Sequence, residues 1–187
     1  MTFIICFLFS ISTYSQGLIH AKGQYFMETA FLAQLEKDPG AGLSLGFGAY
    51  FGPNSSGQIT LSRVGFQTLK SQAIWKTEPG GDSILFAHAV WERYRSLELQ
   101  AIFARKMICI KELLSLKGLI GGSIGLEKGA SRDELPVFGP LLGAETELFF
   151  SRKLALVLRY LFKYQPRSNF QTKSQFQAGL RFIIDGL

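Results

Sequence analysis

Three successive segments near the C-terminal end alternate between apolar and polar residues with a period of two. They are Pro136–Ser151, Lys153–Gln165 and Gln171–Ile184, of 13 to 16 residues each. In the second segment the apolar parity runs from Leu154 to Tyr164, whereas Arg159 and Lys163 have the opposite parity. Strands of soluble proteins are usually about 5–6 residues long. A strand that crosses a bilayer is longer, with a lipid-facing apolar side and an inner side of small or charged residues. The three segments therefore predict strands of a transmembrane barrel.

Composition favours a barrel over a helical membrane protein. The chain of 187 residues is 47% hydrophobic and only 18% charged. No uninterrupted apolar run reaches the about 18 residues that a membrane helix needs, so the apolar residues must be interleaved with polar ones. The net charge of +6 comes from basic residues spread along the chain. They form no basic stripe with interleaved aromatics, which is typical of a nucleic-acid groove, and we expect no direct nucleic acid binding.

The rest of the chain also divides into alternating segments separated by turn signals. Further strands are predicted at Gln24–Glu36, Ala41–Phe51, Gln58–Thr68, Leu97–Lys106 and Leu113–Glu127. Turns or loops are predicted at Asp38–Gly40, Gly52–Gly57, Met107–Glu112, Lys128–Leu135 and Pro166–Phe170. The expected fold is all-β, an eight-stranded antiparallel transmembrane up-and-down β-barrel with both termini on the periplasmic side.

One long excursion, Leu69–Ser96, interrupts this pattern. It holds Trp75, a turn signal at Glu78–Asp82 and the alternating run Ile84–Tyr94. We expect a hairpin extension that protrudes above the membrane. If its two arms counted as separate strands, the barrel would have ten strands rather than eight, and the sequence leaves both counts open.

The N-terminus has the features of a signal peptide. Phe3–Ile11 is an apolar core, and Thr13 and Ser15 are small residues at the −3 and −1 positions of a cleavage site. Cleavage would leave residues 16–187 as the barrel domain and would remove Cys6, so that Cys109 has no intramolecular disulfide partner. The alternative is a buried first strand. Export together with a barrel predicts the outer membrane of a Gram-negative cell.

A set of charged residues has the parity that faces the barrel interior. The predicted network comprises Glu28, Glu98, Lys117, Glu127, Glu145, Glu147, Arg159, Lys163 and Arg181. Because an eight-stranded barrel is just wide enough for side chains to fill it, opposite charges there would pair and close the lumen. We expect no open channel. A proton or solute path along the network is the alternative.

Aromatic residues fall near the predicted strand ends, as in the aromatic girdles of membrane barrels. The predicted interface aromatics are Trp91, Tyr94, Tyr160, Phe162 and Tyr164 at the outer end, and Phe149 and Phe182 at the periplasmic end. Aromatic residues are also common in β-strands generally, which is the alternative explanation for any one of them.

The sequence predicts no catalytic, cofactor or metal site. Of the two histidines, His20 lies in the polar lead-in and His88 on the predicted excursion. No His-x-Ser pair near His88 in the sequence supplies the nucleophile and base that such catalysis uses. A metal site needs clustered His, Cys or carboxylates. Glu145 and Glu147 could bind a cation, but salt bridges to arginine are favoured. Gly121–Gly125 is followed by neither Lys nor a helix, so it is not a phosphate loop.

The C-terminal half resembles a known family. The segments that carry the resemblance are Leu116–Glu127, Phe138–Gly139, Gly143–Glu147, Ser151–Lys153 and Phe176–Ile184. Over about residues 97–184 the chain is similar to the conjugal transfer protein TraO family of Bacteroidetes-type conjugative transposons. The resemblance implies an exported envelope component encoded with a DNA-transfer apparatus, and it implies no catalytic residues.

The leading hypothesis is a small outer-membrane barrel with a structural or interaction role in a conjugative DNA-transfer apparatus. Its expected partners are outer-membrane lipid and other envelope or transfer-apparatus proteins. One alternative is a general outer-membrane binding or adhesion barrel unrelated to transfer. A lipid-modifying outer-membrane enzyme that uses His88, with Ser83 and Glu92 nearby in space, and a soluble all-β carrier are the others.

Overall fold

The computed structural model of the chain describes residues 23–35, 40–77, 83–110, 113–129, 134–168 and 170–184, and for residues 68–77 and 83–91 it describes the backbone. The predicted signal peptide lies outside the described residues and stays a prediction. Within the described part of the chain, no helix combines the length and the apolar character needed to cross a membrane.

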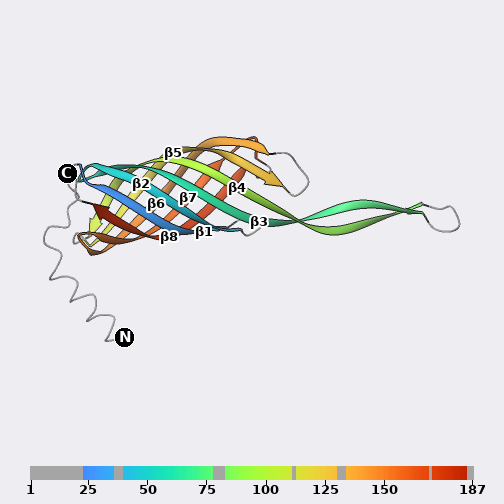
Figure 1. Cartoon of the computed structure of the whole chain (residues 1–187), viewed down its shortest axis with the longest axis horizontal. Coiled ribbons are helices and arrows are strands. Elements are labelled where there is room, and N and C mark those ends of the chain that lie inside the picture. Colours follow the sequence, from blue (N-terminus) through green and yellow to red (C-terminus); the bar gives the residue numbers. More distant parts are fainter. Residues whose placement is uncertain are drawn as a thin grey trace, which may run out of the picture.

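Eight strands make up the described part of the chain. They are β1 (Tyr25–Gln34), β2 (Gly40–Gly52), β3 (Ser55–Thr77), β4 (Ser83–Ile110), β5 (Leu114–Gly129), β6 (Leu135–Ser151), β7 (Leu154–Tyr164) and β8 (Thr172–Ile184). Each strand pairs antiparallel with the next, and β1 pairs with β8 to close the barrel. Figure 1 shows the start of β1 and the end of β8 at the same end of the barrel. The predicted fold class is confirmed.

A two-stranded ribbon extends the barrel at the opposite end (Figure 1). β3 and β4 pair without interruption from Ser55 opposite Arg105 to Thr77 opposite Ser83. β2 pairs with β3 only as far as Phe66, and β5 pairs with β4 only from Tyr94. Gln67–Thr77 and Ser83–Arg93 therefore form a ribbon, called the β3–β4 ribbon below, whose outer edges lie beyond the barrel. Its arms continue β3 and β4, so the strand count is eight rather than ten.

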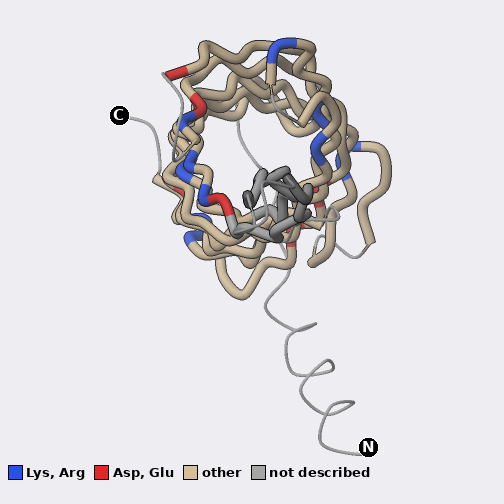
Figure 2. Tube along the Cα trace, turned by 90° about the vertical axis from the view of Figure 1, so that its right-hand side faces the viewer, with Lys and Arg blue, Asp and Glu red and all other residues tan. Residues whose placement is uncertain are grey.

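Alternate residues of every barrel strand point to opposite sides of the wall. On β1, Phe26, Glu28 and Ala30 are buried, whereas the neighbouring Phe31 is 74% exposed. The end view in Figure 2 shows the closed ring that separates the two sides. The predicted parity of β1, β2 and β5–β8 is confirmed, with the apolar parity outside.

Two predicted turns are shorter in the structure. Met107–Glu112 was expected to be a turn, but β4 continues to Ile110. The reason is a shift of register between Lys106 and Ile108, consistent with a β-bulge. A bulge inserts one unpaired residue, which breaks the alternation and hides the continuing strand. The other turn, expected over Gly52–Gly57, is reduced because β3 already begins at Ser55.

Close strand approach inside the barrel requires glycine at Gly121 of β5. A Cβ atom added there would overlap the carbonyl oxygen of Ala101 on β4. At the adjacent Gly122, which has the outward parity, the nearest atom to such a Cβ would be the Gly139 oxygen at 3.7 Å, an ordinary contact. The two glycines therefore form a matched pair for substitution.

We expect Gly121→Ala to destabilise the barrel by about 1–3 kcal/mol, the usual cost of forcing extra volume into a packed interior. Gly122→Ala should leave stability within about 0.5 kcal/mol of the unsubstituted chain. Urea unfolding of the refolded barrel measures both. Equal midpoints for the two variants would contradict the close approach of β4 and β5.

Candidate functional site

Charged residues are concentrated on the inner side of the wall. Among the side chains that the structure describes, five acidic and five basic residues are buried. They are Glu28, Glu98, Glu127, Glu145 and Glu147, and Lys117, Lys163, Lys173, Arg159 and Arg181. Strand alternation places them there, because each has the inward parity of its strand. The charges are equal in number, as burial of ions demands.

One group, called the arginine cluster below, joins strands across the lumen. Arg159 of β7 donates from Nε to Glu145 Oε2 of β6 at 2.8 Å, and its Nη1 lies 3.0 Å from Glu28 Oε1 of β1. Its Nη2 donates to Gln58 Oε1 of β3 at 3.1 Å. A single guanidinium thus connects β1, β3, β6 and β7 through charge-assisted bonds.

Arg181 of β8 completes the arginine cluster. Its Nε donates to Glu28 Oε2 at 3.0 Å, and its Nη1 donates to Glu145 Oε1 at 3.0 Å and also to Glu147. Lys117 Nζ of β5 lies 2.6 Å from Glu147 Oε1. Three carboxylates therefore face two guanidiniums and one ammonium, and both Arg159 and Arg181 occupy the space in which Glu145 and Glu147 could have bound a cation.

A second group, called the lysine cluster below, lies toward the ribbon end. Lys163 Nζ donates to Glu98 Oε2 at 2.8 Å, and Lys173 Nζ donates to Glu127 Oε2 at 2.9 Å. Ser168 Oγ also donates to Glu127 Oε2 at 2.7 Å. The structure thus divides the nine residues of the predicted network between two clusters, and Lys173 makes the second cluster neutral.

Lys173 is absent from the predicted network, yet it is buried and bridges Glu98 and Glu127. Its parity could have revealed it, because it shares the odd positions of β8 with Gln175, Gln177 and Arg181. Gln58 was missed for a different reason. Its role as an acceptor for both arginines depends on contacts across the barrel, which strand alternation alone does not specify.

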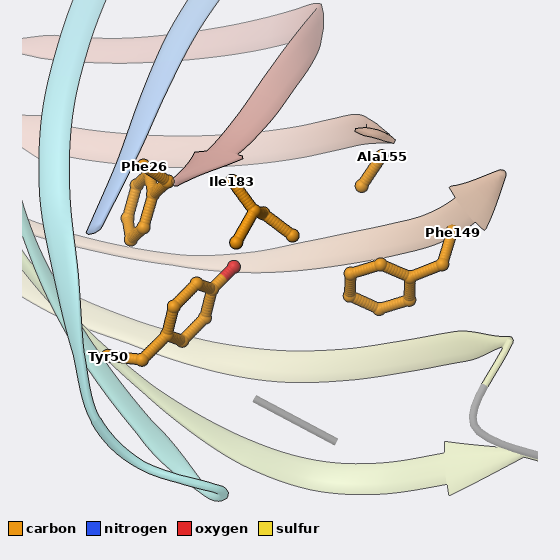
Figure 3. Packing of buried hydrophobic residues seen from close by; sticks show 5 residues of the cluster. All are labelled: Phe26, Tyr50, Phe149, Ala155 and Ile183. Carbon is orange, nitrogen blue, oxygen red and sulfur yellow. The ribbon is translucent and has the colours of Figure 1, made fainter. Parts of the chain in front are cut away.

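Apolar side chains pack at both ends of the charged interior. At the end that carries the termini, the cluster comprises Phe26, Tyr50, Phe149, Ala155 and Ile183. Figure 3 shows Phe26, Tyr50 and Ile183 pointing toward one another. At the ribbon end, Phe66 stacks on Tyr94 with ring centroids 5.3 Å apart, and Phe170 packs edge-on against both rings. Tyr50 joins its cluster to the charges, since its hydroxyl donates to Glu147 Oε1 at 3.1 Å.

Two predicted interface aromatics were wrong. Tyr94 is 1% exposed and Phe149 is 3% exposed, and both face the interior. Tyr94 has the parity of Glu98, and Phe149 has the parity of Glu147, so alternation turns both rings inward although each lies near one end of the barrel. Four others lie on the outer wall with 43–48% exposure, namely Tyr160, Phe162, Tyr164 and Phe182. The side chain of Trp91 lies outside the described residues.

All the buried carboxylates are paired. Each of the five contacts at least one lysine or arginine side chain. In the portion of the chain that the structure describes, no group of three or more His, Cys, Asp and Glu residues is placed to hold a metal ion. The side chain of His88 lies outside the described residues.

Known structures share this architecture. OprG of Pseudomonas aeruginosa, an outer membrane protein, is 8% identical with a TM-score of 0.62 over 90% of this chain and 99% of its own. Ail of Yersinia pestis, the attachment invasion locus protein, is 12% identical with a TM-score of 0.57 over 87% and 99%. The N-terminal barrel domain of P. aeruginosa OprF is 12% identical with a TM-score of 0.51 over 87% and 98%. The chain has the fold of these small barrels.

No family model and no curated protein sequence matches the chain. The resemblance to the TraO family therefore remains a hypothesis.

We expect Arg181→Met to destabilise the barrel by about 3–5 kcal/mol, because it leaves Glu28, Glu145 and Glu147 with two cations in a closed interior. The double variant Arg181→Met/Glu147→Gln restores equal numbers and should recover part of the loss. The control is Lys128→Gln, which removes a cation from the exposed Lys128–Glu134 pair and should cost at most about 1 kcal/mol. Urea unfolding in lipid vesicles measures all three. If Lys128→Gln were as damaging as Arg181→Met, the interior pairing would not be what stabilises the barrel.

Proposed function

We propose that the chain is an integral barrel of the outer membrane, with a closed lumen and an interaction role at the cell surface. The observation that carries the proposal is the apolar outer wall. Phe31, Leu43 and Ile124 are each more than half exposed, and a soluble monomer rarely exposes so continuous an apolar surface. A wall of this kind is stable in contact with the hydrocarbon core of a membrane.

The height of the apolar wall supports the same proposal. On β4 the outward residues Leu97, Leu99, Ala101 and Phe103 lie between Arg95 and Arg105. Ten residues at about 3.3 Å each, tilted by about 40°, span about 25 Å along the barrel axis, which is the height of the apolar band in transmembrane barrels. The arginines would then lie at the two headgroup levels.

Hydrogen bonds that cross the lumen support its closure. Arg159 and Arg181 both donate to Gln58 of β3, and Tyr50 of β2 donates to Glu147 of β6, so side chains fill the middle of the barrel. A channel would need these contacts to open at the cost of leaving buried charges unpaired. The proposal is therefore a barrel that acts through its surface.

The β3–β4 ribbon is the element proposed to bind a partner. Isolated two-stranded hairpins are at best marginally stable in water, and the ribbon extends beyond the other strands (Figure 1). By sequence, Ile84–Trp91 holds no acidic residue, lysine or arginine. A partner that covers this arm would stabilise it. The attachment role in the name of Ail supports attachment as the function.

Conjugative transfer is the second candidate, and the TraO resemblance over about residues 97–184 is what supports it. The partner of the ribbon would then belong to the transfer apparatus or to the recipient cell. The lipid-modifying alternative has less support. The backbone places His88 opposite Gln72 on the ribbon, beyond the apolar wall at which lipid would bind.

Fractionation tests the location. When expressed in a Gram-negative host, the chain should be recovered with the outer membrane and should migrate differently on a gel before and after heating. The purified barrel should give no stable conductance steps in planar bilayers. Recovery in the aqueous fraction would instead favour a soluble carrier, and stable steps would contradict the closed lumen alone.

Replacing residues 69–91 by a short Asn-Gly turn tests the ribbon. We expect the barrel to fold and keep its heat-modifiable migration, because the wall strands are intact, and we expect partner binding to be lost. Two measurements separate the candidates: attachment of expressing cells to host cells or matrix, and transfer frequency in a strain with a transfer apparatus. If neither changed, the ribbon would not be the interaction element.

A further inference from the structure

We propose that the outer wall at the base of the β3–β4 ribbon binds a membrane lipid whose phosphate-bearing headgroup carries a net negative charge. The acyl chain would lie in an apolar groove on the wall, and the phosphate would lie against a cluster of basic residues at the outer end of that groove. This inference rests on the proposed outer-membrane location. It adds a ligand and a binding site to that proposal.

The groove crosses the outward face of β7, β8, β1, β2, β3 and β4. Its lining is mostly apolar and includes Phe31, Leu43, Leu61, Leu97 and Leu180. Two smaller outward residues, Thr29 of β1 and Ala178 of β8, create the hollow between these larger side chains. Arg63 of β3 also lines the groove. A hydrocarbon chain in the hollow would therefore end beside a guanidinium.

Three further basic residues lie toward the outer rim from Arg63. Arg63 pairs with Leu97, and Arg95 is two residues farther along β4 on the same outward face. Arg95 lies directly opposite Lys128 of β5 and opposite Gly65 of β3. Arg93 follows on β4 with the same outward parity and, like Arg63, Arg95 and Lys128, is exposed. The four residues form one basic patch, called the rim patch below.

Of the four basic residues of the rim patch, only Lys128 has an acidic partner among the residues that the structure describes. Like charges directly opposite on neighbouring strands are destabilising, and Arg95 faces Lys128 in this way. Lys128 is 3.4 Å from Glu134, which offsets one charge. Within the described part of the chain, Arg63, Arg93 and Arg95 form no ion pair. A bound anion would remove this repulsion, and arginine suits phosphate because it presents several donors in a planar fork.

Depth in the membrane favours a lipid phosphate over a soluble anion. Arg95 marks the outer edge of the apolar wall, where headgroups lie. A second apolar hollow on the same wall provides the contrast. Its lining includes Phe47, Ala101 and Ile120 but no lysine or arginine. A third hollow, at the other end of the wall, is lined by Arg105 and Lys106. Among the three, only the first joins an apolar groove to basic residues at the ribbon end of the wall, and that combination matches an amphipathic lipid of the outer leaflet.

The experiment uses the full chain folded in detergent and titrated with diphosphoryl lipid A or with phosphatidylcholine, with bound lipid counted by native mass spectrometry. Arg63→Gln/Arg95→Gln should lower the affinity for lipid A about thirty-fold, from about 1 kcal/mol per basic residue near an anionic membrane surface. The matched control is Arg105→Gln, on the outward face of β4 at its other end, which should not change the affinity.

A second pair of variants tests the groove. Ala178→Phe fills it without changing any charge and should also lower the affinity for lipid A, whereas Ala101→Phe in the second hollow should not. Heat-modifiable migration shows that each variant is folded. Equal binding of lipid A and phosphatidylcholine, or equal losses in Arg63→Gln/Arg95→Gln and Arg105→Gln, would overturn the site. Either result leaves the proposed location intact, since fractionation tests that separately.

Discussion

Pairing of ions inside the barrel is the interaction on which the rest of the structure depends. Arg159 of β7 and Arg181 of β8 are fully buried and share Glu28 of β1 and Glu145 of β6, the strands on either side of them. An unpaired buried charge costs several kcal/mol, so these contacts fix which strands face one another. They also fix parity, because a slip of one residue would exchange every inward side chain for an outward one. The charged side chains would then point outward, into the hydrocarbon that the apolar wall is proposed to contact.

Small inward residues let neighbouring parts of the barrel come close together. β2 presents Gly46 and Gly48 inward, and β6 presents Gly139 and Gly143. Phe26 of β1 lies over Gly48, and neighbouring backbone lies against Gly139 and Gly143. The interior is thus asymmetric: strands with small inward residues come as close as their backbones allow, and strands with arginine provide the side chains that reach across. The side chains that fill the lumen are thus the same ones whose charges must balance.

Sequence alternation predicted the strands and the side of the wall that each residue faces, because a period of two is a local property. It could not name the partners of Arg159, since these depend on how β1 meets β8 and on the stagger around the ring. The errors have similar causes. Tyr94 and Phe149 were assigned to interfaces from their position along the strand, whereas parity decides the side. At Met107 the register shift interrupts the alternation of apolar and polar residues, so the sequence there has the pattern of a turn although β4 continues.

The outward residues of β4 change in polarity along the strand, whereas the inward residues show no such change. From the ribbon toward the termini, the outward parity passes from Arg93 and Arg95 through Leu97–Phe103 to Arg105. Over the same length the inward parity stays mixed, with Ser96, Glu98 and Gln100 beside Ile102. In a soluble protein, nothing explains why the outward residues should change from basic to apolar and back to basic while the inward residues stay mixed. A membrane explains it, because its two headgroup regions and its hydrocarbon core select the outward residues, whereas packing inside the barrel selects the inward ones.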